Sequence, residues 1–178
     1  MTHRLFVAIR PPPPIRDALI DRMEGIEGAR WQSDDQLHLT LRYIGEVDGP
    51  QAEDIAGELE KISLAPFRLK IVGVGHFERK GVPKSVWVAV EPSSRLHILQ
   101  RRVERACRRA GREPETRKFI PHITLARLNA STGSIGGFLR ENASFSLPEW
   151  EIDAFLLFES RLSRFGSDYN AIARYPLR

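Results

Sequence analysis

Two copies of a short motif, in which a threonine follows a histidine by two positions, are the features of the sequence that point most directly to chemistry. The first motif occupies residues 38–41 (HLTL) and the second residues 122–125 (HITL). The chain has 5 histidines and 5 threonines among 178 residues, so chance predicts roughly 0.14 such tripeptides. Two copies with the same apolar surroundings therefore indicate a shared role.

The apolar residues within and after each motif are typical of a buried strand, and we expect both motifs to lie in strands. Side chains two positions apart on a strand point to the same face. His38 therefore shares a face with Thr40, and His122 shares a face with Thr124. The leucine or isoleucine between them would point into the core.

Two such pairs facing each other across a cleft could catalyse displacement at phosphorus. An imidazole has an unperturbed pKa near ~6.5, so its neutral and protonated forms are both accessible at neutral pH. One neutral histidine can accept a proton from the nucleophile while a protonated histidine donates to the leaving group. The threonine hydroxyls can donate to the non-bridging oxygens of an anion held between them. This suits in-line displacement, which needs acid and base on opposite sides of the phosphoryl group.

Two arginines beside the motifs could bind the same anion. Arg42 lies two positions after Thr40, which places it on the strand face of His38. Arg127 lies three positions after Thr124 and is out of phase with that face. It would need a bulge or a bend to reach the site. We therefore expect Arg42, more than Arg127, to contact phosphate.

Other chemistries have less support in the sequence. Each histidine could be a satisfied residue of an ordinary strand, but the repetition of the motif argues against this. A zinc site would need carboxylates that neither motif strand offers, and the pattern His-Glu-x-x-His is absent. A nucleophilic triad lacks its Gly-x-Ser-x-Gly turn, and the single cysteine, Cys107, falls in an apolar helical stripe. We expect no metal and no cofactor.

The composition is typical of a soluble globular protein, with 42% apolar and 28% charged residues. The length suits one domain or two small lobes that share a core. No apolar run approaches the roughly 18 residues of a membrane helix, and residues 1–10 are typical of a strand rather than a signal peptide. A single cysteine fits a reducing compartment, so we expect a cytoplasmic protein without membrane contact.

The charge balance is compatible with an anionic partner. The net charge is +4, and 22 of the 27 basic residues are arginine. Arginine binds phosphate in a bidentate manner and stacks on bases. A GC-rich genome would produce the same excess, so the composition leaves both explanations open.

The elements that must position the motifs follow from hydrophobic periodicity. Strands are predicted at residues 5–9, 36–45, 67–71, 85–91, 119–127, 151–158 and 169–174. Helices are predicted after the prolines at 11–14 (with Ile15, Leu19, Met23 and Ile26 on one face), at 50–62, from Ser93 or Ser94 to Gly111, and near 134–141.

This order of elements indicates an internal duplication, because each half runs strand, helix, motif strand, helix, strand. We expect an α+β fold with two pseudo-symmetric lobes, each with a mostly antiparallel sheet and flanking helices. The motif strands would face a central cleft. No linker separates the halves, so residues 1–178 should form a single bilobal domain.

Beyond the motifs, long stretches of the sequence resemble the 2H phosphoesterase superfamily, which is named for its two His-x-Thr motifs. The chain is similar to the branch of RNA 2′,3′-cyclic phosphodiesterases, also called 2′-5′ RNA ligases. The similarity covers essentially the whole chain and is carried by residues 4–9, 37–47, 82–88, 119–127, 159–163 and 169–177. One departure is Ile120, where a basic residue is common in relatives.

The resemblance implies hydrolysis of an RNA 2′,3′-cyclic phosphate to a 2′-phosphomonoester without a metal. It assigns His38 as the proton donor to the 3′-oxygen and His122 as the base that activates water. The nearly symmetric motifs do not by themselves distinguish these roles. Thr40 and Thr124 would bind the phosphate. The partners would be RNAs with 2′,3′-cyclic phosphate ends, such as tRNA fragments. A nucleotide could also bind in the cleft, and we expect a monomer.

Aromatic and basic residues elsewhere are weaker candidates for nucleotide contact. Phe119 and Tyr43 could stack on a base, as could Phe6, Phe77 and Tyr169, although most of these rings are expected in the core. A basic helix face could follow an RNA backbone or could be the solvated face opposite the apolar stripe. It is formed by Arg101, Arg102, Arg105, Arg108, Arg109 and Arg112.

Three rival functions stay open at this point: 2′-5′ ligation of RNA ends, hydrolysis of a small cyclic nucleotide, and non-catalytic binding of RNA ends. Replacing either motif histidine by alanine separates an enzyme from a binding module. The enzyme would lose turnover and keep its affinity for the RNA end, whereas the binding module has no turnover to lose.

Overall fold

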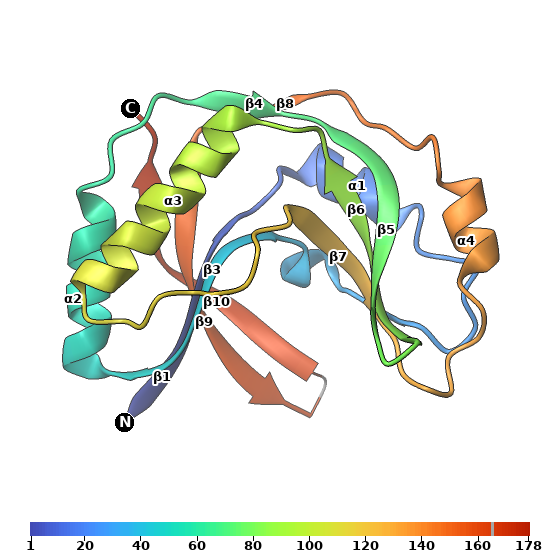
Figure 1. Cartoon of the computed structure of the whole chain (residues 1–178), viewed down its shortest axis with the longest axis horizontal. Helices are drawn as coiled ribbons and strands as arrows, with labels where there is room; N and C mark the ends of the chain where they lie inside the picture. Colours follow the sequence, from blue (N-terminus) through green and yellow to red (C-terminus); the bar gives the residue numbers. More distant parts are fainter. Residues whose placement is uncertain (165) are drawn as a thin grey trace.

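The computed structural model describes residues 1–164 and 166–178, and most of its strands form one eight-stranded sheet (Figure 1). The strands of this sheet are β1 (Thr2–Ile9), β2 (Arg30–Trp31), β3 (Leu39–Asp48), β5 (Ile71–Arg79), β6 (Val82–Val90), β7 (His122–Arg127), β9 (Ala154–Ser163) and β10 (Gly166–Pro176). Strands β4 (Phe67–Leu69) and β8 (Trp150–Ile152) form a separate pair. The helices are α1 (Pro13–Ile20), α2 (Gly49–Glu60), α3 (Ser94–Arg109), α4 (Gly136–Glu141) and the short 3-10 helix η1 (Asp34–Gln36).

The large sheet has two parts that meet at β3 and β7. Its order is β10-β9-β1-β3-β7-β6-β5, with β2 also paired to β7, and these strand pairings are antiparallel. The β3–β7 pairing consists of one position, Leu39 opposite Ile123. The expected α+β class with a mostly antiparallel sheet is thus confirmed. The two parts are interleaved in sequence, however, because the C-terminal strands β9 and β10 return to pair beside β1.

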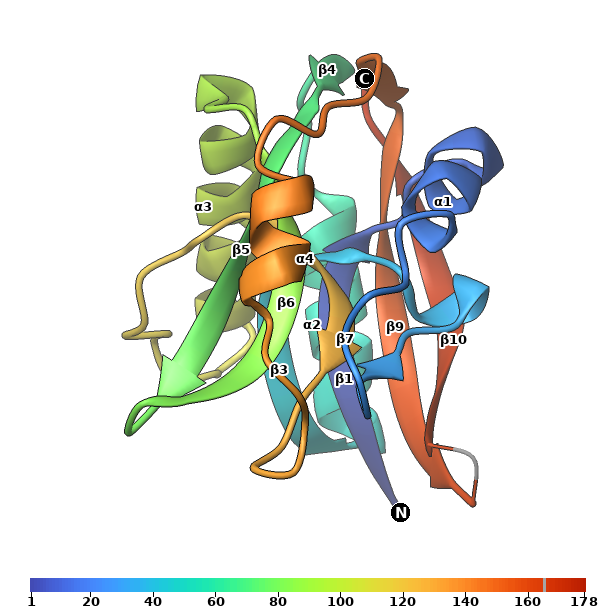
Figure 2. The same cartoon turned by 90° about the vertical axis from the view of Figure 1, so that its right-hand side faces the viewer.

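Buried apolar side chains from both parts of the sheet form one continuous core. Helices α2 and α3 pack against each other and against β3, whereas α4 lies at the far end of the molecule (Figures 1 and 2). A second, small cluster of Phe6, Ala8 and Phe158 packs apart from this core. Since side chains alternate along β1, this cluster marks the sheet face opposite the core.

Helix α3 begins and ends as the sequence predicts. The hydroxyl of Ser93 accepts a hydrogen bond from the backbone N–H of Leu96 at 3.1 Å and caps the first turn. The predicted apolar stripe is buried. Gly111 follows the last turn with a φ of +95°, a conformation that favours glycine after a helix.

The main differences between the predicted elements and the structure concern one helix and one strand. Helix α1 ends at Ile20, so Met23 and Ile26 lie beyond it, where Gly25 adopts a φ of +87° and turns the chain. Strand β5 was not predicted as a strand of its own; its glycines, such as Gly75, hide its strand character because glycine has low strand propensity. No helix among the described residues combines the length and apolar character needed to cross a membrane.

Candidate active site

The two His-x-Thr motifs meet where the two parts of the sheet join. Their middle residues, Leu39 and Ile123, pair with each other between β3 and β7 and are fully buried. Because side chains alternate along a strand, the residues on either side of them project from the opposite face of the sheet. That face therefore carries the four predicted site residues, all of them half-buried: His38, Thr40, His122 and Thr124.

The charges of the second part of the sheet act directly on the first histidine. Burial is the largest cause that lowers the pKa of His38, to about 4, and the positive charges of Arg127 and His122 lower it further. Burial also lowers the pKa of His122. Since both values lie below the unperturbed one, both rings are mainly neutral at neutral pH.

Each histidine ring is held by a backbone carbonyl two residues earlier in the chain. His38 Nδ1 lies 2.7 Å from the oxygen of Gln36, and His122 Nδ1 lies 2.6 Å from the oxygen of Ile120. A carbonyl oxygen only accepts, so each Nδ1 carries the hydrogen and donates it. In the neutral ring this leaves Nε2 unprotonated. Each Nε2 can therefore accept a proton or, after protonation, donate one.

The segment that holds His38 is itself anchored. The side-chain oxygen of Gln36 accepts a hydrogen bond from the N–H of Ser33 at 2.9 Å, and its amide nitrogen donates to the oxygen of Ser167 at 3.0 Å. The first bond closes the start of η1, and the second connects η1 to β10. Sequence reasoning did not identify Gln36 as a positioning residue, because its role depends on a contact 131 residues away in the chain.

Aromatic rings surround both imidazoles and cause their burial. The ring of His38 lies 4.8 Å from that of Phe6 and 5.3 Å edge-on from that of Tyr169. The ring of His122 lies 4.9 Å edge-on from that of Phe77 and 5.4 Å from that of Trp87. The ring of Phe158 lies 6.3 Å from that of His38, and neither Phe158 nor Trp87 was among the residues predicted for the site. Trp87 alternates with Val86 and Val88 in the predicted strand at 85–91, and this alternation could have indicated that its ring lies on the face opposite theirs.

A bulge in β7 brings Arg127 onto the face of the motif residues. Thr124 is opposite Trp87 and Arg127 is opposite Ser85, with a register shift between them. Trp87 and Ser85 are two residues apart and share a face, so Thr124 and Arg127 share one as well. Arg127 is exposed there, and its charge acts on His38. The bulge that Arg127 needs in order to reach the face of the motif residues is therefore present.

A matching bulge in β3 turns Arg42 away from this face, so the expected placement of Arg42 beside His38 is wrong. Thr40 is opposite Ala8, whereas Arg42 is opposite Val7, again with a register shift. Adjacent residues of β1 point to opposite faces, and Arg42 follows Val7 toward the core. Only 6% of Arg42 is exposed. Alternation of side chains over five residues could not reveal a one-residue bulge.

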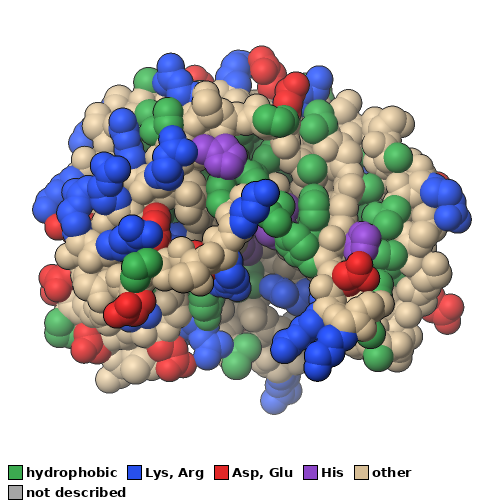
Figure 3. All heavy atoms as spheres, viewed as in Figure 1, with side chains coloured by type: hydrophobic (Ala, Val, Ile, Leu, Met, Phe, Trp, Pro, Cys, Tyr) green, Lys and Arg blue, Asp and Glu red, His purple; other side chains and the backbone are tan. Residues whose placement is uncertain are grey.

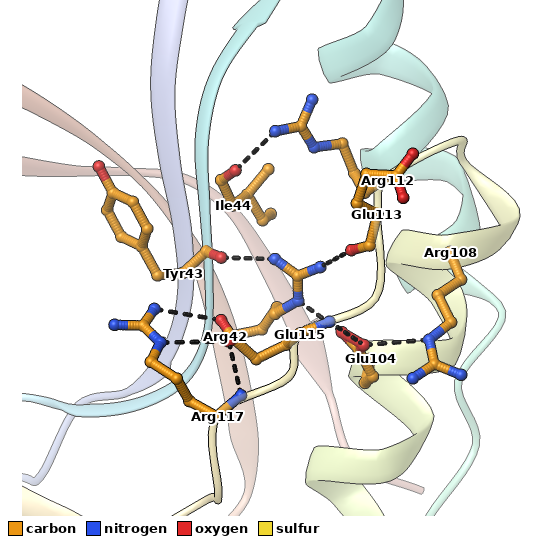
Figure 4. Close-up of polar contacts among 9 residues, drawn as sticks. All are labelled: Arg42, Tyr43, Ile44, Glu104, Arg108, Arg112, Glu113, Glu115 and Arg117. Carbon is orange, nitrogen blue, oxygen red and sulfur yellow. Dashed lines mark hydrogen bonds and ion pairs between the residues drawn. The ribbon is translucent and has the colours of Figure 1, made fainter.

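Arg42 instead connects β3 to helix α3 and to the segment after it (Figure 4). Its Nε contacts the carboxylate of Glu104 at 2.5 Å, and its two terminal nitrogens donate to the carbonyl oxygens of Tyr43 and Glu113. Glu104 also accepts from the N–H of Glu115 at 3.0 Å. These contacts fix the segment that leads to the second motif. The pairing with Arg42 and its other partners outweighs burial and lowers the pKa of Glu104.

The same bulge that turns Arg42 inward places Tyr43 on the site face. Tyr43 is opposite Phe6 in the β1–β3 pairing and points away from Arg42 (Figure 4). It is 45% exposed. Phe119, the other predicted stacking residue, precedes the start of β7 and packs edge-on against His97 at 5.4 Å. Tyr43 is therefore better placed than Phe119 to contact a ligand.

Arg30 is a residue of this face that sequence reasoning missed. It lies directly opposite Arg127 in the β2–β7 pairing, while its neighbour Trp31 packs on Phe138. Both arginines are exposed, and neither has an ion-pair partner within residues 1–164 and 166–178. Like charges opposite each other destabilise a sheet, and a bound anion would relieve that repulsion. Only the two-residue length of β2 hid this pairing from the sequence.

The molecular surface in this region is hollowed. Figure 3 shows a recess near the centre of the face viewed in Figure 1, with basic side chains around it. In the part of the chain that the structure describes, no three His, Cys, Asp or Glu side chains lie close enough together to hold a metal ion.

Several known proteins are similar to this chain over most of its length. The chain is 34% identical over 142 residues to an RNA 2′,3′-cyclic phosphodiesterase of Aeropyrum pernix, covering 78% of this chain and 81% of that one. It is 32% identical to an RNA 2′,3′-cyclic phosphodiesterase of Thermus thermophilus, covering 98% and 90%. The crystal structure of Escherichia coli LigT with 3′-AMP has a TM-score of 0.79 and 26% identity, covering 99% of both chains.

A family model described as the 2′-5′ RNA ligase superfamily matches residues 11–161. This range contains both motifs, Arg30 and Arg127. The resemblance to the 2H phosphoesterases found in the sequence is confirmed, and the chain belongs to the 2′-5′ RNA ligase superfamily.

Proposed function

We propose that this protein hydrolyses 2′,3′-cyclic phosphate ends of RNA to 2′-phosphomonoesters by acid/base catalysis between His38 and His122. The observation that carries the proposal is the meeting of the two motifs on one sheet face, each imidazole with its Nδ1 fixed and its Nε2 available. The names of the relatives support the choice of substrate. The 3′-AMP bound by the Escherichia coli relative supports a nucleotide-binding cleft.

In this mechanism His122 is the base and His38 is the acid. Nε2 of His122 accepts a proton from a water molecule, and the water oxygen forms a bond to phosphorus. The bond from phosphorus to the ribose 3′-oxygen breaks, and protonated His38 donates its Nε2 proton to that oxygen. The products are a 2′-phosphomonoester and a free 3′-hydroxyl. Each general acid or base of this kind contributes about 10² to 10⁴ in rate.

The oxygens of the phosphate are stabilised by neutral and charged donors. The hydroxyls of Thr40 and Thr124 donate to the non-bridging oxygens, on which negative charge grows in the transition state. Arg127 supplies positive charge on the same face. Tyr43 stacks on the terminal base.

His38 takes up its proton from solvent when the substrate binds. Both histidines are mainly neutral in the free protein, because burial lowers both pKa values. A phosphodiester anion held between them favours the protonated form of the ring that it contacts and raises its pKa. Substrate binding and protonation of the acid are therefore coupled.

The proposed reaction uses no metal and no cofactor, and a monomer is sufficient for it because both motifs lie in one chain. Addition of a chelator should leave the rate unchanged. Formation of a 2′-5′ bond would be the same displacement with the 5′-hydroxyl of a second RNA in place of water, so a ligase activity would use the same four motif residues.

The experiment that tests the proposed reaction is identification of the product isomer. A short RNA ending in a 2′,3′-cyclic phosphate is incubated with the protein and a chelator, and the product is compared with synthetic 2′-phosphate and 3′-phosphate standards. The proposal predicts the 2′-phosphate alone. A 3′-phosphate product would reverse the assignment of the leaving group, and a chelator-sensitive rate would contradict the metal-free mechanism.

A further inference from the structure

The positive charge of this protein is concentrated in one segment that leads to the second motif. Residues 94–121 contain nine Lys and Arg residues and three Glu, which gives a net charge of +6, whereas the whole chain has +4. The rest of the molecule therefore carries a net charge of −2. A basic region of this kind on an otherwise weakly acidic protein is an electrostatic footprint for a polyanion.

Part of this charge is used inside the protein, on the side of α3 that faces α2. Arg102 donates to the oxygen of Ser63, and Arg109 lies 3.9 Å from Glu58. These two arginines hold α3 against its neighbours. Their charges are therefore partly used within the protein.

Most acidic residues of the segment 94–121 form ion pairs with arginines of this protein. Glu104 binds Arg42 and Arg108, and Glu115 binds Arg117. Four basic side chains are left exposed without an ion-pair or hydrogen-bond partner within residues 1–164 and 166–178. They are Arg95, Arg101, Arg105 and Lys118, and we call them the free basic residues.

The position of Arg101 connects the free basic residues to the active site. His97, Arg101 and Glu104 follow one another at i, i+4 and i+7 and so share one stripe of α3. At one end of this stripe His97 contacts Phe119, and at the other Glu104 accepts from the N–H of Glu115. Arg101 thus lies beside the segment that runs directly into His122. Figure 3 shows basic side chains gathered over α3 on the same face of the molecule as the central recess.

The chemistry of this surface favours a nucleic acid strand over a lipid membrane. A helix that binds at a membrane interface exposes apolar side chains next to its basic ones. Helix α3, which the structure describes completely, exposes no large apolar side chain, and the segment after it exposes one, Ile120. Arginines four residues apart rise about 6 Å along a helix, and so offer repeated charges to a backbone of repeated phosphates.

We propose that the free basic residues of α3 and of the segment after it bind the phosphate backbone of the RNA upstream of its cyclic end. This inference rests on the proposed function and assigns the substrate class: RNA chains of many nucleotides rather than mono- or dinucleotides. The terminal nucleotide occupies the site between the motifs, and the preceding nucleotides run over α3. The active site then recognises the cyclic phosphate end of the RNA, and α3 contributes affinity for the nucleotides that precede it.

The test compares a double variant, Arg101→Gln with Arg105→Gln, with a control that also removes two exposed positive charges. The control is Lys84→Gln with Arg140→Gln, on β6 and α4 in the other half of the molecule. Each protein is given a dinucleotide and a 20-nucleotide RNA that share the same cyclic end. We expect kcat/KM for the 20-nucleotide RNA to fall about tenfold at 0.1 M salt in the α3 variant only, with the dinucleotide rate unchanged.

The salt dependence gives a second measurement. Each phosphate contact on a single strand contributes about 0.7 to the slope of log K against log salt concentration. The slope for the 20-nucleotide RNA should therefore decrease by about 1.4 in the α3 variant. An equal loss for both substrates, or no loss for the longer one, would overturn the proposal.

Binding measurements distinguish failure of this inference from failure of the proposed function. Fluorescence anisotropy with the same 20-nucleotide RNA ending in a 2′-phosphate needs no turnover. If the wild type shows no hydrolysis but the α3 variant still loses RNA affinity, the proposed reaction fails and the RNA surface stands. Loss of binding to vesicles of acidic phospholipid, without loss of RNA binding, would replace the RNA with a membrane as the partner of this surface.

Discussion

The two motif histidines are nearly equivalent in sequence, and their surroundings make them different. Both rings donate from Nδ1 to a carbonyl oxygen two residues earlier, so the backbone geometry is the same. Burial, together with the positive charge of Arg127, lowers the pKa of His38 to about 4. The difference between the two rings therefore arises from their surroundings rather than from the motifs.

The first prediction at this scale concerns the pH dependence of kcat/KM, which reports the free protein. His122 must be neutral to act as the base, so its titration makes the rate rise with pH. His38 must be protonated to act as the acid, so its titration, with a pKa of about 4, makes the rate fall with pH. Both values lie below the ordinary one near ~6.5. The maximum of kcat/KM should therefore lie below pH 6.5, with a fall of about tenfold per pH unit above it. A maximum at or above pH 7 would show that the pKa values are not lowered.

The second residue-scale prediction concerns Arg127 and its neighbour Arg30. Arg127→Gln should lower kcat/KM by about 10²-fold, the usual effect of losing a donor to a developing anion. It should also raise the pKa of His38, because a positive charge beside the ring is removed. The part of the pH profile that reports the titration of His38 should therefore move to higher pH. Arg30→Gln should raise KM with little change in kcat. Identical profiles for wild type and Arg127→Gln would place Arg127 outside the site.

At the scale of elements, two bulges decide which side chains reach the active site. One lies in β3 and one in β7, each directly after a motif threonine. They place Tyr43 and Arg127 on the active face and send Arg42 to the core. A further element, β5, is shaped by Gly75, because a Cβ there would lie 2.4 Å from the ring of Trp87.

The prediction for this element is that Gly75→Ala displaces Trp87 and, with it, the ring of His122 that Trp87 contacts at 5.4 Å. Turnover should fall at least tenfold, and the tryptophan fluorescence spectrum should shift. The matched control is Gly57→Ala, which has nothing within 4 Å of the new Cβ and should stabilise α2 by about 0.5–1 kcal/mol. Equal activity of the two variants would show that Trp87 does not position His122.

The comparison of sequence and structure at this scale has a physical explanation. Helix α3, the motif strands and the common face of the four motif residues could be predicted, since long periodic segments and side-chain alternation are local properties. The bulges, the partner of Arg42 and the pairing of Arg30 with Arg127 could not. Each depends on register between strands, which tertiary contacts set and the hydrophobic period does not encode.

At the scale of the whole molecule, the proposed active site lies at the junction between two interleaved parts of one sheet. The chain ends return to the same part, since β9 and β10 pair beside β1, and one continuous core underlies both. Neither part is a contiguous stretch of the sequence. We therefore expect the two parts to fold together as a single domain.

This expectation can be measured by denaturant unfolding with two probes. Two of the three tryptophans, Trp31 and Trp87, lie in the part that contains β7, so tryptophan fluorescence follows mainly that part. Circular dichroism at 222 nm is dominated by helices and so follows α2 and α3, which pack on β3. The two transitions should coincide at one midpoint. Separate midpoints would show two independently folding units and would contradict the single-domain interpretation.

The central claim is that His38 and His122 act together on a cyclic phosphate end, and single-turnover rates of wild type, His38→Ala and His122→Ala test it most directly. All three proteins are given an RNA ending in a 2′,3′-cyclic phosphate, and its affinity is measured alongside. We predict a loss of at least about 10²-fold in rate for each variant, with RNA affinity retained within a few-fold. Turnover by either variant within tenfold of the wild type, or none by the wild type, would contradict the account.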